Sequence, residues 1–87
     1  MDSIDLQIIN KLGLHARAAA KFATLARNFS SDIQIEKEGR IVNGKSIMGI
    51  MMLAAGQGTL VTLRADGEDA DIALSELKAL VENRFGE

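Results

Sequence analysis

The chain has 87 residues, a formal net charge of −2, no cysteine, one histidine and three phenylalanines as its only aromatic residues. This length suits a single domain with one hydrophobic core, and we expect residues 1–87 to form that domain. An acidic balance with few aromatic side chains argues against nucleic acid as a partner, and one histidine without cysteine cannot build an ordinary zinc site. We therefore expect neither a metal nor another cofactor.

The charge and hydropathy pattern indicates neither a secretory signal nor a membrane span. Acidic residues stand among the first five positions, where a secretory signal would carry basic residues. The longest apolar run, residues 47–56, is far shorter than the roughly 20 residues that cross a bilayer. We expect a cytoplasmic protein that does not contact membranes.

A strand, a loop and a helix are predicted for the first third of the chain. Ile4, Leu6 and Ile8 alternate with polar residues, which is typical of a strand with one solvated face. Residues 10–14 form a loop, and from 16 to 29 the apolar residues follow helical spacing. The opposite face of this helix is polar, so the helix should pack one side against the core.

A hairpin and a short helix are predicted for the middle of the chain. Residues 33–36 alternate between apolar and polar, and a turn at residues 38–39 leads into a short strand at 40–43. Ser46 precedes an apolar run and is a good N-cap, which predicts a helix over residues 47–53.

This middle helix is apolar on every side, and a helix on the outside of a two-layer domain cannot bury all of its faces. We expect Ile50 and Leu53 to point inward. The remaining apolar residues would form either part of the core or an exposed, adaptable surface that binds partners, and the pattern leaves both roles open. These residues are Ile47, Met48, Met51 and Met52.

The last third of the chain predicts a strand and an amphipathic helix. Residues 59–65 alternate, and Asp66-Gly67 makes a turn. Glu68, Asp69 and Asp71 then place acid at the start of a helix, where the dipole favours it. The apolar stripe of this helix comprises Ala70, Ala73, Leu74, Leu77 and Val81.

The resulting order is β-α-β-β-α-β-α within one α+β domain. Half-solvated strands and amphipathic helices predict a mostly antiparallel sheet with all helices on one face. A ferredoxin-like domain with an extra helix fits the same pattern equally well.

The only histidine, His15, lies where a glycine-containing loop passes into the first helix. The opening turn of a helix offers unpaired N–H groups and the positive end of the dipole, which together bind anions. The same field favours an uncharged imidazole, which can attack phosphorus. Gly13 would let the loop turn tightly, and Arg17 could donate charge-assisted hydrogen bonds to phosphoryl oxygens. The alternative is that His15 is simply a surface or capping residue.

Two motifs, Gly-Leu-His-Ala-Arg-Ala-Ala at residues 13–19 and Asn-Gly-Lys-Ser-Ile-Met-Gly at 43–49, resemble those of the HPr family. These proteins are histidine-containing phosphocarriers of the bacterial phosphoenolpyruvate-dependent phosphotransferase system. The resemblance covers essentially the whole chain and implies an open-faced β-sandwich with strand order 1-4-2-3 and three helices on one face. The run 47–55 and the ending 84–87 are most similar to the nitrogen-related (NPr-like) branch.

The resemblance implies a phosphoryl carrier and not an enzyme. His15 would accept a phosphoryl group on Nδ1 from enzyme I and pass it to an EIIA-type protein, while Arg17 and the N–H groups of Ala16 and Arg17 hold its oxygens. In many members the serine equivalent to Ser46 is phosphorylated by an HPr kinase/phosphorylase, and its alternative role is that of a plain helix cap. The implied partner surface comprises Ile47, Met48, Met51, Met52 and Lys21, with a solvated lysine as the simpler interpretation of Lys21.

Two further expectations concern the setting of this function. Many members carry proline where this chain has Ala18. Alanine in the first turn destabilises a helix little compared with proline. The difference favours a regulatory role in nitrogen or carbon metabolism over sugar transport. A carrier that presents one face to successive partners is most simply a monomer. The rival function is a non-catalytic regulatory module that binds partners through the Met48 and Met51 patch, with His15 as a cap only.

Overall fold

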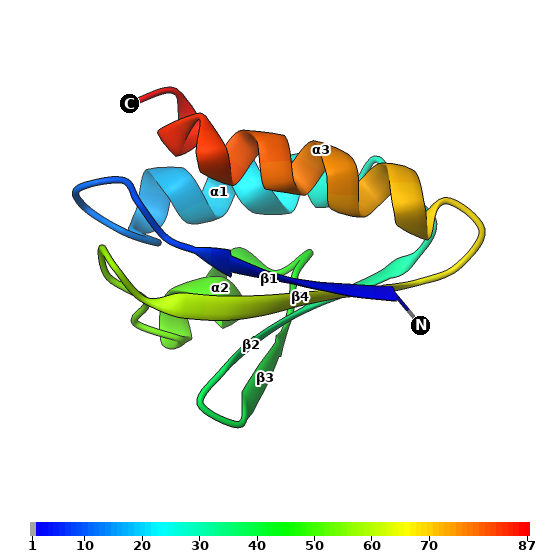
Figure 1. Ribbon diagram of the computed structural model, residues 1–87, viewed down its shortest axis with the longest axis horizontal. Helices are drawn as coiled ribbons and strands as arrows, with labels where there is room; N and C mark the ends of the chain where they lie inside the picture. Colours follow the sequence, from blue (N-terminus) through cyan, green and yellow to red (C-terminus); the bar gives the residue numbers. More distant parts are fainter. Residues whose placement is uncertain (1) are drawn as a thin grey trace.

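The computed structural model describes residues 2–87 and confirms the α+β class and the predicted strand order (Figure 1). One antiparallel sheet has the order β1-β4-β2-β3, and the helices lie on one side of it. The elements are β1 (Asp2–Gln7), α1 (Ala16–Ala26), β2 (Asp32–Lys37), β3 (Arg40–Asn43), α2 (Ile47–Met52), β4 (Leu60–Asp66), α3 (Ala70–Glu82) and the 3₁₀ turn η1 (Arg84–Gly86). Within this described range, none of the helices has the length and hydropathy needed to cross a bilayer.

Strict alternation along the strands decides which side chains enter the core. In the central strand β4, Val61, Leu63 and Ala65 are buried, and the register sets Ile35 of β2 and Ile4 of β1 on either side of Leu63. Full burial of one such aliphatic side chain stabilises the fold by about 1.5–3 kcal/mol. This apolar row fixes the register, because a slip of one residue would turn every buried side chain to solvent.

Helix α1 packs the predicted apolar side against the sheet but ends earlier than predicted. The prediction of a helix to residue 29 is wrong by three residues, because the N–H groups of Asn28 and Phe29 bond to carbonyls three residues back and tighten the chain into a turn. Ala19 and Ala23, which the periodicity did not single out, are also fully buried. Their small side chains allow the helix to lie close to its neighbours.

Helix α2 begins at the predicted cap. The Ser46 hydroxyl accepts the N–H of Gly49 at 3.0 Å, and Ile50 and Leu53 point into the core as predicted. The helix ends at Met52, one residue before the predicted end. Two cations, Lys37 and Arg40, donate to carbonyl oxygens at this end, so the β2-β3 hairpin holds α2 in place.

The acidic residues before α3 do more than favour the helix dipole. The carboxylate of Asp69 accepts hydrogen bonds from the N–H groups of Ser30 and Ser31, at 2.9 and 3.0 Å, and from the Ser31 hydroxyl. The hydrogen bond from the Ser31 hydroxyl has the largest effect on the Asp69 carboxyl, and together these hydrogen bonds lower the pKa of Asp69 to about 2. Asp69 therefore ties the turn after α1 to the start of α3, and of the three acidic residues only Asp71 lies in the first helical turn.

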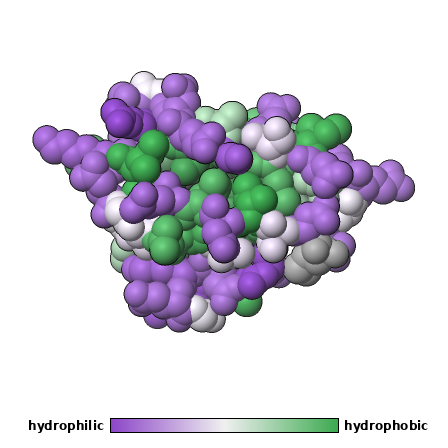
Figure 2. All heavy atoms as spheres, viewed as in Figure 1, coloured by the Kyte–Doolittle hydropathy of each residue, from purple (hydrophilic) through white to green (hydrophobic). Residues whose placement is uncertain are grey.

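The surface between α3 and β1 shows apolar side chains gathered in the middle of a mostly polar face (Figure 2). A cavity of about 590 Å³ opens beside the first half of α3. It lies away from η1, which follows the other end of that helix. Its lining residues are Asp2, Ser3, Ile4, Asp71, Leu74, Ser75 and Lys78.

The loop before α1 makes the predicted tight turn at Gly13. The backbone of Gly13 has φ +65°, and a Cβ atom there would lie 2.4 Å from the carbonyl oxygen of Ala55. The next residue, Leu14, donates its N–H to the same carbonyl at 2.8 Å. The start of α1 is thereby fixed against the segment that follows α2.

Replacing Asp69 with asparagine should destabilise the fold in a pH-dependent way. Because the pKa of Asp69 is lower in the folded state than in the unfolded state, its contribution is fully present above about pH 4 and is lost as the pH falls towards 2. We expect Asp69→Asn to lower Tm by about 5 °C at pH 7 and by almost nothing near pH 2. Thermal unfolding followed by circular dichroism tests this, and an equal loss in the neighbouring control Glu68→Gln would contradict it.

Replacing Gly13 with alanine should cost more than the same change at Gly39. Both glycines have positive φ, but a Cβ at Gly39 meets no atom within 4 Å. Gly39→Ala should therefore cost only the backbone strain of about 1–2 kcal/mol, whereas Gly13→Ala should cost roughly 3 kcal/mol or more. Urea unfolding measures both values, and equal losses would show that the contact with Ala55 does not constrain the loop.

Candidate functional site

His15 occupies the N-cap position of α1, as the sequence predicted. Its backbone is extended, with φ −72° and ψ 178°, and its carbonyl oxygen accepts the N–H of Ala19 at 2.8 Å. The N–H groups of Ala16 and Arg17 therefore precede the first hydrogen bond of the helix and point out of its open end. The His15 side chain makes no capping hydrogen bond and is 26% exposed, so the ring is accessible beside these donors.

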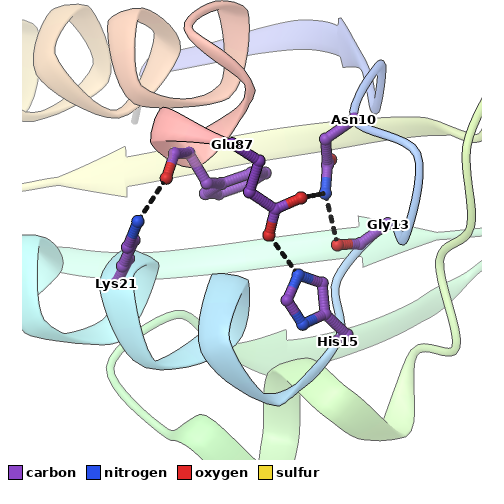
Figure 3. A network of polar contacts seen from close by, with 6 residues as sticks. Asn10, Gly13, His15, Lys21 and Glu87 are labelled. Atoms are coloured by element: carbon purple, nitrogen blue, oxygen red, sulfur yellow. Dashed lines mark hydrogen bonds and ion pairs between the residues drawn. The ribbon is translucent and has the colours of Figure 1, made fainter.

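The imidazole of His15 is held from one side by Glu87. Its Nε2 atom pairs with Oε2 of Glu87, and Oε1 of the same carboxylate accepts a hydrogen bond from Nδ2 of Asn10 at 3.2 Å (Figure 3). The hydrogen bond to His15 is the main reason why the pKa of Glu87 lies below its ordinary value, with Asn10 adding to the effect. Glu87 is therefore ionised near neutral pH.

Asn10 connects this carboxylate to the loop before α1. It is only 1% exposed, and its Nδ2 atom also donates to the carbonyl oxygen of Gly13 at 2.8 Å. One buried amide thus fixes both the turn that leads to His15 and the group that holds the His15 ring.

Lys21 is more than a solvated lysine. Its Nζ atom donates to the carbonyl oxygen of Phe85 in η1 at 2.5 Å, and the Phe85 side chain is buried in the core. Lys21 thereby attaches the segment that carries Glu87 to α1. The part of Lys21 in partner binding stays a prediction.

Arg17 lies on the exposed first turn of α1, two residues after His15. Its side chain lines an open, mostly apolar groove between α1 and α3, together with Leu25 and Leu80. Among residues 2–87 its guanidinium makes no hydrogen bond or ion pair, and the structure does not bring it onto the His15 ring. Its role in holding phosphoryl oxygens stays a prediction.

The predicted partner surface lies on α2, beside the helix that carries His15. Met48 is 75% exposed, and Met51 and Met52 are also exposed, whereas Ile47 is half-buried and packs against the core. The Arg27 side chain donates to the carbonyl oxygen of Lys45, just before α2, at 3.0 Å. With the bond from Leu14 to Ala55 near the other end, this contact sets α2 alongside α1 in the opposite direction.

The sequence did not point to Asn10 or Glu87 as site residues. They lie 77 positions apart, and neither belongs to a periodic pattern or to the two motifs. A contact between distant residues of this kind becomes visible only once the fold brings the chain end to the loop before α1.

Comparison with known proteins agrees with this geometry. The family model "PTS HPr component phosphorylation site" matches residues 3–83. Phosphocarrier protein HPr of Cupriavidus necator is 59% identical over 83 residues, which are 95% of this chain and 93% of that protein. Phosphocarrier protein NPr of Shewanella violacea is 46% identical over 80 residues, which are 92% and 88% of the two chains.

A solved structure gives the same result for the fold. The crystal structure of HPr-C-His from Thermoanaerobacter tengcongensis superposes with a TM-score of 0.97 at 49% identity, covering 100% of this chain and 98% of that one. Sequence motifs, strand order and the partly exposed histidine at the start of α1 thus agree with one family. The chain belongs to the HPr family of phosphotransferase-system phosphocarriers, which includes NPr, and is a carrier of phosphoryl groups and not an enzyme.

Proposed function

We propose that His15 accepts a phosphoryl group on Nδ1 from phosphorylated enzyme I and passes it to a histidine of an EIIA-type protein. The observation that supports this best is the placement of the ring. Its Nε2 atom is occupied by Glu87, whereas Nδ1 makes no hydrogen bond among residues 2–87. The ring is also accessible to a partner, as a carrier requires.

The transfer needs only groups that the chain and its donor supply. The Nδ1 lone pair forms the new N–P bond while the N–P bond of the donor breaks and its electron pair returns to the donor's ring. The N–H groups of Ala16 and Arg17 are positioned at the helix start to receive the phosphoryl oxygens, and the Arg17 guanidinium can swing from its exposed position to join them. Passing the group onward is the same step in reverse.

The exposed methionines support docking as a part of this function. A carrier must bind different partners in turn, and flexible thioether side chains adapt to different surfaces. We propose that Met48, Met51 and Met52 form the contact, with Ile47 contributing its exposed edge and Lys21 contributing from the exposed side of α1. The rival function, in which His15 is only a cap, is not supported, because the His15 side chain makes no capping hydrogen bond.

Ser46 is proposed as a regulatory phosphorylation site for an HPr kinase/phosphorylase. Its hydroxyl caps α2, so a phosphate would add negative charge beside Met48 and Met51 without removing the helix. Such a charge would repel an acidic partner surface and weaken docking.

The setting of the carrier is also a proposal. We propose a cytoplasmic monomer whose output is the regulation of nitrogen or carbon metabolism. An HPr from Thermoanaerobacter tengcongensis that is 49% identical to this chain has also been solved as a dimer. A measurement of the molar mass of this chain in solution therefore tests whether it is a monomer.

Incubation with enzyme I and phosphoenolpyruvate should place an acid-labile, alkali-stable phosphate on the wild-type chain and none on His15→Ala. Phosphate bound to imidazole nitrogen has this stability, whereas phosphoserine does not. Ser46→Ala is the matched control and should label like the wild type. Equal labelling of His15→Ala would contradict the proposed function. A pure binding module would be favoured if phosphorylation had no effect and Met48→Lys alone abolished partner binding.

Replacing Arg17 with alanine should leave the fold intact and slow transfer from enzyme I by roughly 10²-fold or more, since a donor to the charge of a transferring group has about this effect. Rapid quench-flow measurement of phosphohistidine formation gives the rate of transfer. Lys78→Ala removes a cation from the exposed side of α3 and should transfer at the wild-type rate. An unchanged rate in Arg17→Ala would remove Arg17 from the site.

A further inference from the structure

We propose that the exposed methionines of α2 form an oxidation-sensitive site, at which a peroxide converts the thioethers of Met48, Met51 and Met52 to sulfoxides and thereby weakens partner docking. The effect of this site on transfer rests on the docking function proposed above for α2. The modification is separate from phosphorylation of His15 and of Ser46.

The three thioethers are accessible to a small oxidant. Met48 is 75% exposed, Met52 64% and Met51 43%. The chain has no cysteine, so thioethers are the side chains that a peroxide oxidises most readily. The other large apolar side chains exposed within residues 2–87 are aliphatic and do not react in this way. They are Leu12, Ile41, Leu60 and Ile72.

The spacing of the methionines places them on one side of α2. Met51 and Met52 follow Met48 by three and four residues, and side chains with this spacing are neighbours on a helix. Ile50 and Leu53, which lie on the other side, are buried in the core. The thioethers therefore form one outward stripe, and a sulfoxide at any of them lies in the surface that is proposed to dock.

The chemistry of the step explains the loss of docking. Hydrogen peroxide transfers one oxygen atom to the sulfur, so that an S–O bond forms as the O–O bond breaks. The sulfur loses two electrons, and the peroxide is reduced to water. A sulfoxide is polar, and its burial against an apolar partner surface without a hydrogen-bond donor is unfavourable. Methionine sulfoxide reductases reverse the step, so the site can act as a switch.

Oxidation should leave the helix itself in place, because the contacts that hold α2 do not involve sulfur. The Ser46 hydroxyl caps its start, and the buried Ile50 and Leu53 side chains anchor it to the core. Lys37 and Arg40 donate to carbonyl oxygens at its other end. The oxidised chain therefore keeps its fold and loses affinity for its partners.

The test oxidises the chain with hydrogen peroxide, removes the peroxide with catalase and measures transfer from enzyme I. Mass spectrometry of peptides should find sulfoxide at Met48 and Met52 before Met51, in the order of their exposure. The KM for the chain as phosphoryl acceptor should rise about 10-fold with kcat unchanged, since docking and not chemistry is impaired. The circular dichroism spectrum should not change, and treatment with methionine sulfoxide reductases should restore the original KM.

A triple variant, Met48→Leu, Met51→Leu and Met52→Leu, is the matched control because it keeps an apolar surface without sulfur and retains Met1. Each chain is compared with its own untreated form, and peroxide should change the KM of the wild type but not that of the triple variant. The inference is overturned if the oxidised wild type keeps its KM, or if the triple variant loses as much affinity on oxidation. Normal docking of Met48→Lys would instead overturn the docking function, and labelling of His15→Ala would overturn the role of His15, so these failures are distinguishable.

Discussion

The hydrogen bond from the N–H of Leu14 to the carbonyl of Ala55 sets the position of His15, the candidate phosphoryl acceptor. It clamps the loop before α1 onto the segment that follows α2, and Gly13 permits the close approach because it has no Cβ. The chain must then enter α1 at a fixed point, and His15 becomes the N-cap with its ring outside the core. A site built on rigid backbone in this way holds its geometry better than a side chain on a flexible loop.

Three other groups lie around the fixed position of His15 and supply the charge and the apolar surface of the site. The open end of α1 provides N–H donors, η1 brings the Glu87 carboxylate to the back of the ring, and α2 provides an exposed apolar surface alongside. The family assignment identifies a phosphocarrier, and the His15 ring is partly exposed at the surface. A partner protein can reach this ring, because the ring is not enclosed.

Local pattern was enough to predict the order of the elements, the cap at Ser46, the inward direction of Ile50 and Leu53, and the place of His15. These features depend on residues within a few positions of one another, which periodicity and capping preferences describe. The end of α1, the clamp made by Asp69 and the pairing of Asn10 with Glu87 could not be predicted. The contacts of Asp69 and of Asn10 each depend on a partner 38 or more positions away, which tertiary packing brings close. The end of α1 depends on a tightening of its last turn, which the apolar spacing does not reveal.

The measurement that tests the site most directly is the one-bond coupling between phosphorus and nitrogen in the ¹⁵N-histidine-labelled, phosphorylated chain. Phosphate on Nδ1 should split the Nδ1 resonance and leave Nε2 with its proton. A coupling to Nε2, or a phosphorylated chain in which neither nitrogen of His15 is coupled to phosphorus, would contradict the assignment of Nδ1 as the atom that carries the group.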